Sequence, residues 1–296
     1  MTISKFALGA VLATAFGAAP FAAAAQTAPA PAASATPQPA PDICSTGISA
    51  VIGRPTQTNS VCTVKSNQVL IESGYQSQTV VISGGAFTFQ TYPNVAIRIG
   101  TALPNVEVQV LPPGLIRSGG GSVTSDVAAG LKWQIASTPS FAYGANVIVT
   151  APTGTDPATN ANGFGSANAT TFLANANVQG SLGKVFGYGA TLSMQRLAAP
   201  APAPLSGIVR YTSIVPSVDL TASLPANWGV AVEVFRQSNG EGPSTPTHTW
   251  FDAALTKGIG KAQFDVSYGA SNAVVPGPGL PSVRRFYVGA GLSYGF

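Results

Sequence analysis

Apolar residues alternate with small or polar residues through most of the chain after about residue 67. Side chains of a β-strand point alternately to its two faces, so a period of two predicts strands that are apolar on one face only. Segments 94–100, 106–110 and 126–135 show this division. The final segment shows it best, with an apolar face of Phe286, Val288, Ala290, Leu292, Tyr294 and Phe296.

Gly, Pro, Asn and Ser gather between the alternating segments and mark where the chain turns. Five short turns alternate with six longer loops, which gives eleven connections and therefore twelve strands. The first loop is predicted at 77–89, although residues 80–90 could instead extend the first two strands; another longer loop is predicted at 112–122. The predicted strands are 67–76, 90–101, 105–111, 123–136, 140–151, 169–183, 187–196, 207–223, 227–237, 247–257, 261–272 and 284–296.

The second face of each strand distinguishes two classes of β protein. A soluble sandwich buries its apolar face and turns a charged face to water. Here the second face carries mostly Gly, Ser, Ala, Asn and Gln with single charges, and aromatic residues lie near strand ends on the apolar face. Those features are typical of a barrel whose outside meets lipid. The predicted fold class is therefore all-β: a transmembrane up-and-down antiparallel β-barrel of 12 strands, with short periplasmic turns and longer outer loops.

Composition supports this class and argues against others. Charged residues make up 8% of the 296 residues, against roughly 25% in a typical soluble domain, and mean hydropathy is +0.28. Ten carboxylates, one His and two Cys, without phosphate-loop or metal-ligand spacing, argue against a conventional α/β enzyme, and no cofactor is expected. The net charge is +4 without any Lys/Arg run, so no nucleic-acid partner is predicted.

The chain before residue 67 divides into three parts. Residues 1–25 are organised as a cleaved export signal, with Lys5 before an apolar stretch and small residues at the cleavage site. Pro20 breaks that stretch, which is shorter than the roughly 20 residues of a membrane-spanning helix. The composition of residues 26–41 predicts a disordered Ala/Pro-rich leader. Segment 42–66 then precedes the barrel at 67–296.

The chain has two cysteines, Cys44 and Cys62. In an exported protein an isolated pair favours one disulfide, and two free thiols are the alternative. No metal site is predicted, because the chain lacks a CxxC pair and contains a single histidine.

The alternation places nine charged residues on the face away from lipid: Glu72, Arg98, Glu107, Asp126, Lys132, Asp219, Glu233, Asp252 and Asp265. All but Asp126, which is expected nearer the outside, should form a belt in the periplasmic half of the lumen. The belt is interpreted as a neutralising network that plugs a narrow barrel or as a constriction that selects solutes, and the two are compatible. Its six acidic and two basic groups predict tolerance of cations or neutral solutes.

His248, Trp250, Phe235 and Tyr287 also point inward in this assignment. They predict either an aromatic-lined mouth or aromatic packing beneath the loops. A hydrolase would need a serine activated by His248, which faces the lumen rather than the lipid rim, so no enzyme activity is predicted.

The last strand ends in aromatic residues. Tyr294 and Phe296 resemble the signal by which the barrel-assembly machinery recognises outer-membrane proteins. The alternative is an ordinary strand end, since any strand can finish with aromatic residues.

Several segments resemble those of a known family in their order and spacing. They are GRPTQTNSVCTVKSNQVLIESGYQ, YPNVAIRIGTALPNVEVQV, GSVTSDVAAGLKWQI, VTAPTGT and FYVGAGLSYGF. From Gly53 to Phe296 the chain is similar to the outer-membrane transporter-like barrels associated with the meta pathway of phenol degradation. The residues that carry the resemblance include Arg54, Glu72, Gly74, Tyr75, Arg98, Gly100, Glu107, Asp126, Gly130, Lys132 and Trp133. The leader and the cysteine pair depart from the family.

The resemblance implies an outer-membrane channel or transporter for uptake or efflux of small hydrophobic or aromatic compounds. The expected location is the bacterial outer membrane. The expected partners are outer-membrane lipid, the barrel-assembly machinery and a small-molecule solute. A plugged structural or adhesive barrel without transport is one alternative, and an outer-membrane hydrolase is a second.

Overall fold

The computed structural model describes residues 42–45, 48–54, 56–82, 84–119, 121–156, 166–200, 207–238, 247–274 and 282–296. These residues belong to one unit, Ala40–Phe296. The predicted signal peptide at 1–25 and the predicted leader at 26–41 lie outside the described residues.

Strands dominate this part of the chain. Three short helical segments accompany them: η1 (Ile43–Ser45), α1 (Ile48–Val51) and η3 (Pro225–Asn227). The strands are β1 (Val69–Ile82), β2 (Gly85–Gly100), β3 (Val106–Leu111), β4 (Leu115–Ser118), β5 (Gly121–Thr124), β6 (Val127–Ser137), β7 (Phe141–Ala151), β8 (Thr171–Leu182), β9 (Phe186–Pro200), β10 (Ile208–Leu224), β11 (Trp228–Gln237), β12 (His248–Ile259), β13 (Ala262–Ser271) and β14 (Arg284–Gly295).

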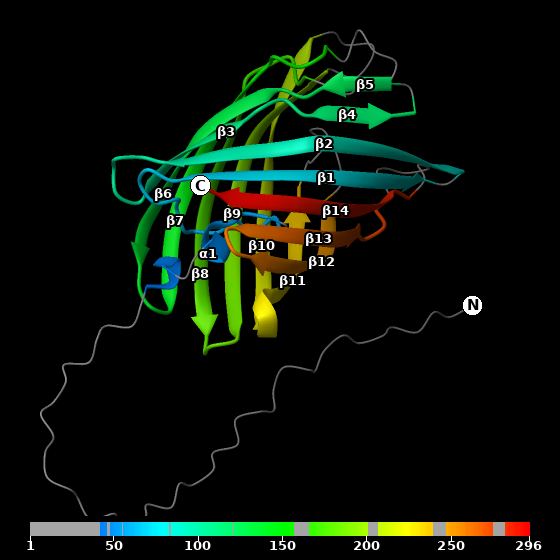
Figure 1. Cartoon of the computed structure of the whole chain (residues 1–296). Helices are drawn as coiled ribbons and strands as arrows, with labels where there is room; N and C mark the ends of the chain where they lie inside the picture. The colour runs from blue at the N-terminus through cyan, green and yellow to red at the C-terminus, as the bar shows by residue number, and fades with distance from the viewer. Residues whose placement is uncertain are drawn as a thin grey trace, which may run out of the picture. The chain divides into compact units, whose positions relative to one another are not determined.

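Backbone hydrogen bonds join the strands into a closed ring. β1 pairs antiparallel with β2 on one side and with β14 on the other, so the first and last strands meet. Figure 1 shows β14 lying between β1 and β13. The ring consists of β1 to β3 and β6 to β14, which confirms the predicted 12-stranded antiparallel barrel. Closure removes the two free edges that an open sheet of these strands would have at β1 and β14.

A hairpin of β4 and β5 lies beside the ring. β4 pairs with β2 from Gln90↔Arg117 to Tyr92↔Leu115, and with β5 along its whole length. The loop predicted at 112–122 is therefore wrong. Pro112 and Pro113 interrupt the strand because proline has no N–H to donate, and the chain resumes pairing with β2 only beyond them.

The first hairpin is longer than predicted. The loop expected at 77–89 is wrong, because β1 and β2 stay paired up to Ile82↔Gly85. The alternative, in which residues 80–90 extend both strands, is confirmed. β-branched and aromatic residues such as Val80 and Phe87 favour strands, and Gly84 adopts the φ of +96° that the tight turn needs.

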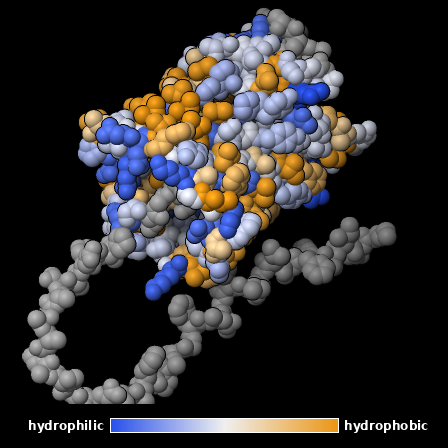
Figure 2. Space-filling view, viewed as in Figure 1, coloured by the Kyte–Doolittle hydropathy of each residue, from blue (hydrophilic) through white to orange (hydrophobic). Residues whose placement is uncertain are grey.

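The outer surface of the barrel wall is apolar. Leu131 and Trp133 are 57% and 54% exposed, whereas Lys132 between them is 3% exposed. Figure 2 shows broad hydrophobic areas on the face turned to the viewer. In the described part of the chain no helix is both long enough and apolar enough to cross a membrane.

Replacing Leu131 with Arg should prevent stable insertion, because a basic side chain at the bilayer midplane costs about 2–4 kcal/mol. Electrophoresis of extracted membranes with and without heating measures the folded fraction. Leu131→Phe, which stays apolar, and Asp252→Asn, on the inner face, should both insert normally. Equal losses in Leu131→Arg and Asp252→Asn would contradict the assignment of the two faces.

Candidate functional site

The segment before β1 lies inside the barrel and follows its inner wall. Gly53 N–H donates to Glu72 of β1, and Arg54 Nε lies 3.7 Å from Asp265 Oδ2 of β13. The next backbone N–H groups donate to successive strands: Gln57 and Thr58 to Glu233 of β11, Asn59 to Thr191 of β9, Val61 to Gln179 of β8, Thr63 to Gln134 of β6 and Val64 to Glu107 of β3. Residues 51–54 and 56–66 thus run around the lumen, and we call them the inner ring.

The inner ring needs these side chains because most of its backbone belongs to no helix or strand. Val61 and Cys62 are completely buried. Buried N–H and C=O groups without partners are costly, so an irregular segment in this position must bond to its surroundings. The sequence offered no periodic signal for this arrangement, and the segment 42–66 was given no position relative to the barrel.

Ion pairs gather where the ring passes β1 to β6. Arg98 donates from Nε and Nη2 to the two carboxylate oxygens of Glu107 at 2.6 and 2.9 Å, and from Nη1 to Glu72 at 2.9 Å. Lys132 Nζ donates to the Cys62 carbonyl at 2.8 Å, and Arg98 also donates to the carbonyls of Val51 and Cys62. A two-bonded guanidinium–carboxylate pair is a strong, oriented interaction. The basic side chains therefore hold the ring by its carbonyl oxygens.

Carboxylates dominate the opposite part of the wall. Glu233 lies directly opposite Asp219 on β10 and Asp252 on β12 in the strand register. Like charges in that position repel, so each carboxylate needs donors. Glu233 accepts from the N–H groups of Gln57 and Thr58 at 2.7 and 2.6 Å and from the Thr58 hydroxyl at 2.5 Å. Asp252 accepts from the Tyr287 hydroxyl at 2.5 Å. Here the barrel holds the ring by its N–H groups.

The predicted belt residues are covered in this conformation. Glu107 is completely buried, and Glu72, Arg98, Lys132, Glu233, Asp252 and Asp265 are at most 8% exposed. Asp219 is half-buried. Most of these charged side chains thus bond to one another or to the inner ring. Asp252 bonds to Tyr287, and Asp265 forms an ion pair with Arg54 of the ring.

Asp126 lies apart from the belt, between β5 and β6. Its Oδ1 accepts from the N–H groups of Thr153 and Gly154 at 3.0 and 2.9 Å, and its Oδ2 accepts from Ala167 at 3.0 Å. Asp126 therefore organises the backbone on both sides of the loop between β7 and β8.

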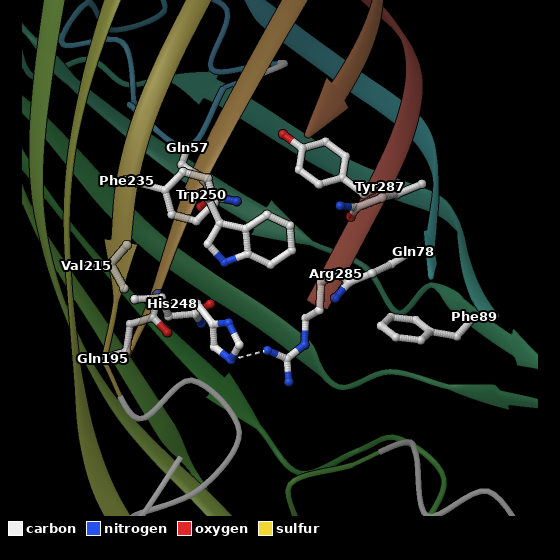
Figure 3. A pocket seen from close by; sticks show the side chains of 12 residues that line it. Gln57, Gln78, Phe89, Gln195, Val215, Phe235, His248, Trp250, Arg285 and Tyr287 are labelled. Carbon is white, nitrogen blue, oxygen red and sulfur yellow. Dashed lines mark hydrogen bonds between the residues drawn. The ribbon is translucent and has the colours of Figure 1, made fainter. Parts of the chain in front are cut away.

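A cavity of about 310 Å³ adjoins the inner ring, and we call it the aromatic chamber. The four inward residues predicted from the sequence all line it (Figure 3). Phe235 and Trp250 stack with ring centroids 5.6 Å apart, and Tyr287 is tilted against Trp250 at 5.9 Å. Gln57 of the inner ring also lines the chamber. The remaining lining residues are Gln76, Gln78, Phe89, Gln195, Val215, Gln237, His248 and Arg285.

Arg285 and the glutamines were missed as site residues. Arg285 precedes Phe286 and so lies on the opposite face from the apolar residues of the last strand; its inward direction was available from the alternation. The glutamines carry no charge and belong to three separate strands and the inner ring, so nothing in the sequence linked them. Only the fold brings them together.

His248 is hydrogen-bonded to Arg285. Arg285 Nη1 donates to His248 Nε2 at 2.5 Å, since a guanidinium cannot accept a hydrogen bond. Nε2 of His248 is therefore occupied in this structure. Among the described residues no group of three or more His, Cys, Asp or Glu is arranged to hold a metal ion.

A disulfide joins Cys44 to Cys62, 18 residues apart, and overturns the alternative of two free thiols. Near Cys44, Ile43 N–H donates to the Thr138 carbonyl at 3.0 Å, in the turn between β6 and β7. The disulfide therefore connects the inner ring to the barrel end that carries this short turn.

A closed ring of strands with an apolar outside and a polar, charged inside defines a membrane-spanning β-barrel of the outer-membrane type. The fold is similar to that of the COG4313 outer membrane channel from Pseudomonas putida F1, with a TM-score of 0.61, 15% identity, and coverage of 82% of this chain and 100% of that chain. It is also similar to the NanC porin, with a TM-score of 0.51, 11% identity, and coverage of 76% and 98%. No protein-family model and no curated protein sequence matches the chain significantly.

Replacing Arg98 with Gln should lower the free energy of unfolding by about 3–5 kcal/mol, because Glu72 and Glu107 would stay buried without their cation. Denaturant unfolding in detergent measures the change. Arg117→Gln, an exposed site on β4, is the matched control and should change it by less than about 0.5 kcal/mol. Similar losses in both variants would show that the ion pairs do not stabilise the barrel.

Proposed function

We propose that the protein is an outer-membrane channel or transporter for small hydrophobic or aromatic compounds. The observation that carries the proposal is the aromatic chamber, a cavity inside the barrel with aromatic rings on several sides and amides between them. Cavities of roughly 300–1,000 Å³ suit small molecules, and polar groups in their walls fix the orientation of the ligand. Here five glutamines, His248 and Arg285 supply many polar groups beside the aromatic rings. The channel and the porin of similar fold support passage of a solute through such a barrel.

We further propose that the chain is a member of the outer-membrane barrels associated with the meta pathway of phenol degradation. This assignment is supported by where the resembling residues lie. Glu72, Arg98, Glu107 and Lys132 meet around the inner ring, and Arg54 is part of the ring. Five of the residues that carry the resemblance thus bond to the inner ring or belong to it.

We also propose the remaining expectations from the sequence. Residues 1–25 act as a signal peptide and 26–41 as a leader. Tyr294 and Phe296 are 42% and 60% exposed on the outer face, where the barrel-assembly machinery and outer-membrane lipid can contact them. Phe296 N–H donates to the Val69 carbonyl at 2.8 Å, so the terminal residue also takes part in closing the ring. No enzyme activity is proposed, because His248 bonds to Arg285.

A closed barrel without transport is the second candidate function. The observation that favours it is the burial of the belt beneath the inner ring. In a channel, part of the inner ring must leave the wall or shift along it before a solute passes. The two candidates therefore differ in whether the ring moves.

Uptake into proteoliposomes tests the first candidate. Purified protein should admit phenol-like compounds faster than sugars or amino acids of similar size, because the aromatic chamber offers ring surfaces. Protein-free liposomes are the control for direct permeation of each compound. Equal uptake with and without protein for every compound would support the closed barrel.

Replacing Glu233 with Gln should raise the frequency of current steps in planar bilayers several-fold. The amide has one acceptor oxygen in place of the two that hold Gln57 and Thr58, so the ring should detach more often. Asp252→Asn, at the position directly opposite, is the matched control, because Asp252 accepts from Tyr287 instead. Silent membranes with all three proteins would favour the closed barrel.

A further inference from the structure

The aromatic chamber contains a buried hydrogen-bond donor without a partner. Trp250 is 5% exposed, and its Nε1 bonds to no atom in the described part of the chain. Buried indole N–H groups usually find an acceptor. Figure 3 shows the nitrogen-bearing edge of Trp250 turned toward His248 and Arg285. An acceptor atom of a ligand between these residues would satisfy the donor.

One residue in the wall of the chamber carries a positive charge. Of the described residues that line it, Arg285 is the only one with a formal charge when His248 is neutral, as its bond from the arginine requires. A guanidinium presents several N–H donors in one plane, which matches the two oxygens of a carboxylate. The acceptor that suits both Arg285 and Trp250 is therefore an anionic oxygen.

The aromatic side chains of the chamber indicate which chemical group the ligand carries besides the anionic oxygen. Phe235 stacks on one side of Trp250 with an interplanar angle of 8°, and Tyr287 stands at 45° to Trp250. The Tyr287 hydroxyl is bonded to Asp252, so Tyr287 offers its ring rather than its oxygen. Planar rings pack well against such surfaces in offset or edge-to-face contact. A volume of about 310 Å³ suits a compound with one ring.

We propose that the aromatic chamber binds single-ring aromatic carboxylates. The aromatic ring lies against Trp250 and Tyr287, and the carboxylate accepts hydrogen bonds from Trp250 Nε1 and the Arg285 guanidinium. The inference rests on the proposed transport function and names its solute class.

Calorimetric titration of the detergent-solubilised full chain tests the proposal with four probes. Benzoate should bind about tenfold more tightly than benzamide, which has a similar shape but no charge, and than cyclohexanecarboxylate, which has the charge but no aromatic ring. It should also bind more tightly than galacturonate, an acidic sugar. Equal affinity for benzoate and benzamide, or tighter binding of galacturonate, would overturn the proposal.

Substitutions of residues that line the chamber test whether benzoate binds there. Arg285→Gln should remove the preference for benzoate over benzamide, whereas Arg285→Lys should keep part of it. Arg284→Gln is the matched control, because Arg284 is the adjacent residue and lies exposed over the ring of Phe286. Trp250→Phe keeps a ring but loses the N–H, and should weaken benzoate binding several-fold. Heat-modifiable electrophoresis verifies that each variant is folded, and a folded Arg285→Gln protein with unchanged preference contradicts the proposal.

The binding and uptake experiments fail separately. Preferential binding of benzoate without uptake into proteoliposomes would uphold the chamber as a carboxylate site and reject the transport function. Uptake of neutral aromatic compounds without preferential binding of benzoate would do the reverse.

Discussion

Every backbone N–H and C=O group that leaves water must find a partner, and this barrel meets the requirement in two ways. In the wall, strand pairs satisfy one another, and β1 with β14 completes the circle. In the lumen, side chains of the wall satisfy the irregular inner ring. Carboxylates face its N–H groups near β11, and cations face its carbonyls near β2 and β6. Carboxylates in both parts of the wall thus accept from N–H groups of the ring, and the two cations donate to its carbonyls.

The fold could be predicted because its main signal is local. Each of the twelve strands of the ring alternates by itself, and turn residues mark most of the ends. The two errors have local causes as well. Pro112 and Pro113 interrupt the strand pairing, which resumes with β2 after them. In the first hairpin, residues 77–89 resemble a loop in composition, although they pair almost to the tip of the hairpin.

The candidate site was accessible only in part. Alternation pointed Phe235, Trp250 and Tyr287 inward, and Figure 3 shows that these rings share one cavity. The inner ring was not accessible, because an irregular backbone has no period and its partners lie far away in sequence. Thr58, for example, bonds to Glu233, which is 175 residues distant. Such a contact depends on the closed circle of strands, which no short segment encodes.

The disulfide has a consequence for the order of biogenesis. Cys62 is enclosed completely within the finished barrel, and its sulfur accepts a hydrogen bond from Gln179 of the wall. While the inner ring is bonded to the wall, an oxidising enzyme cannot contact that sulfur. Oxidation before the strands wrap around the segment needs no detachment of the ring, so we expect the covalent loop to form in the unassembled chain.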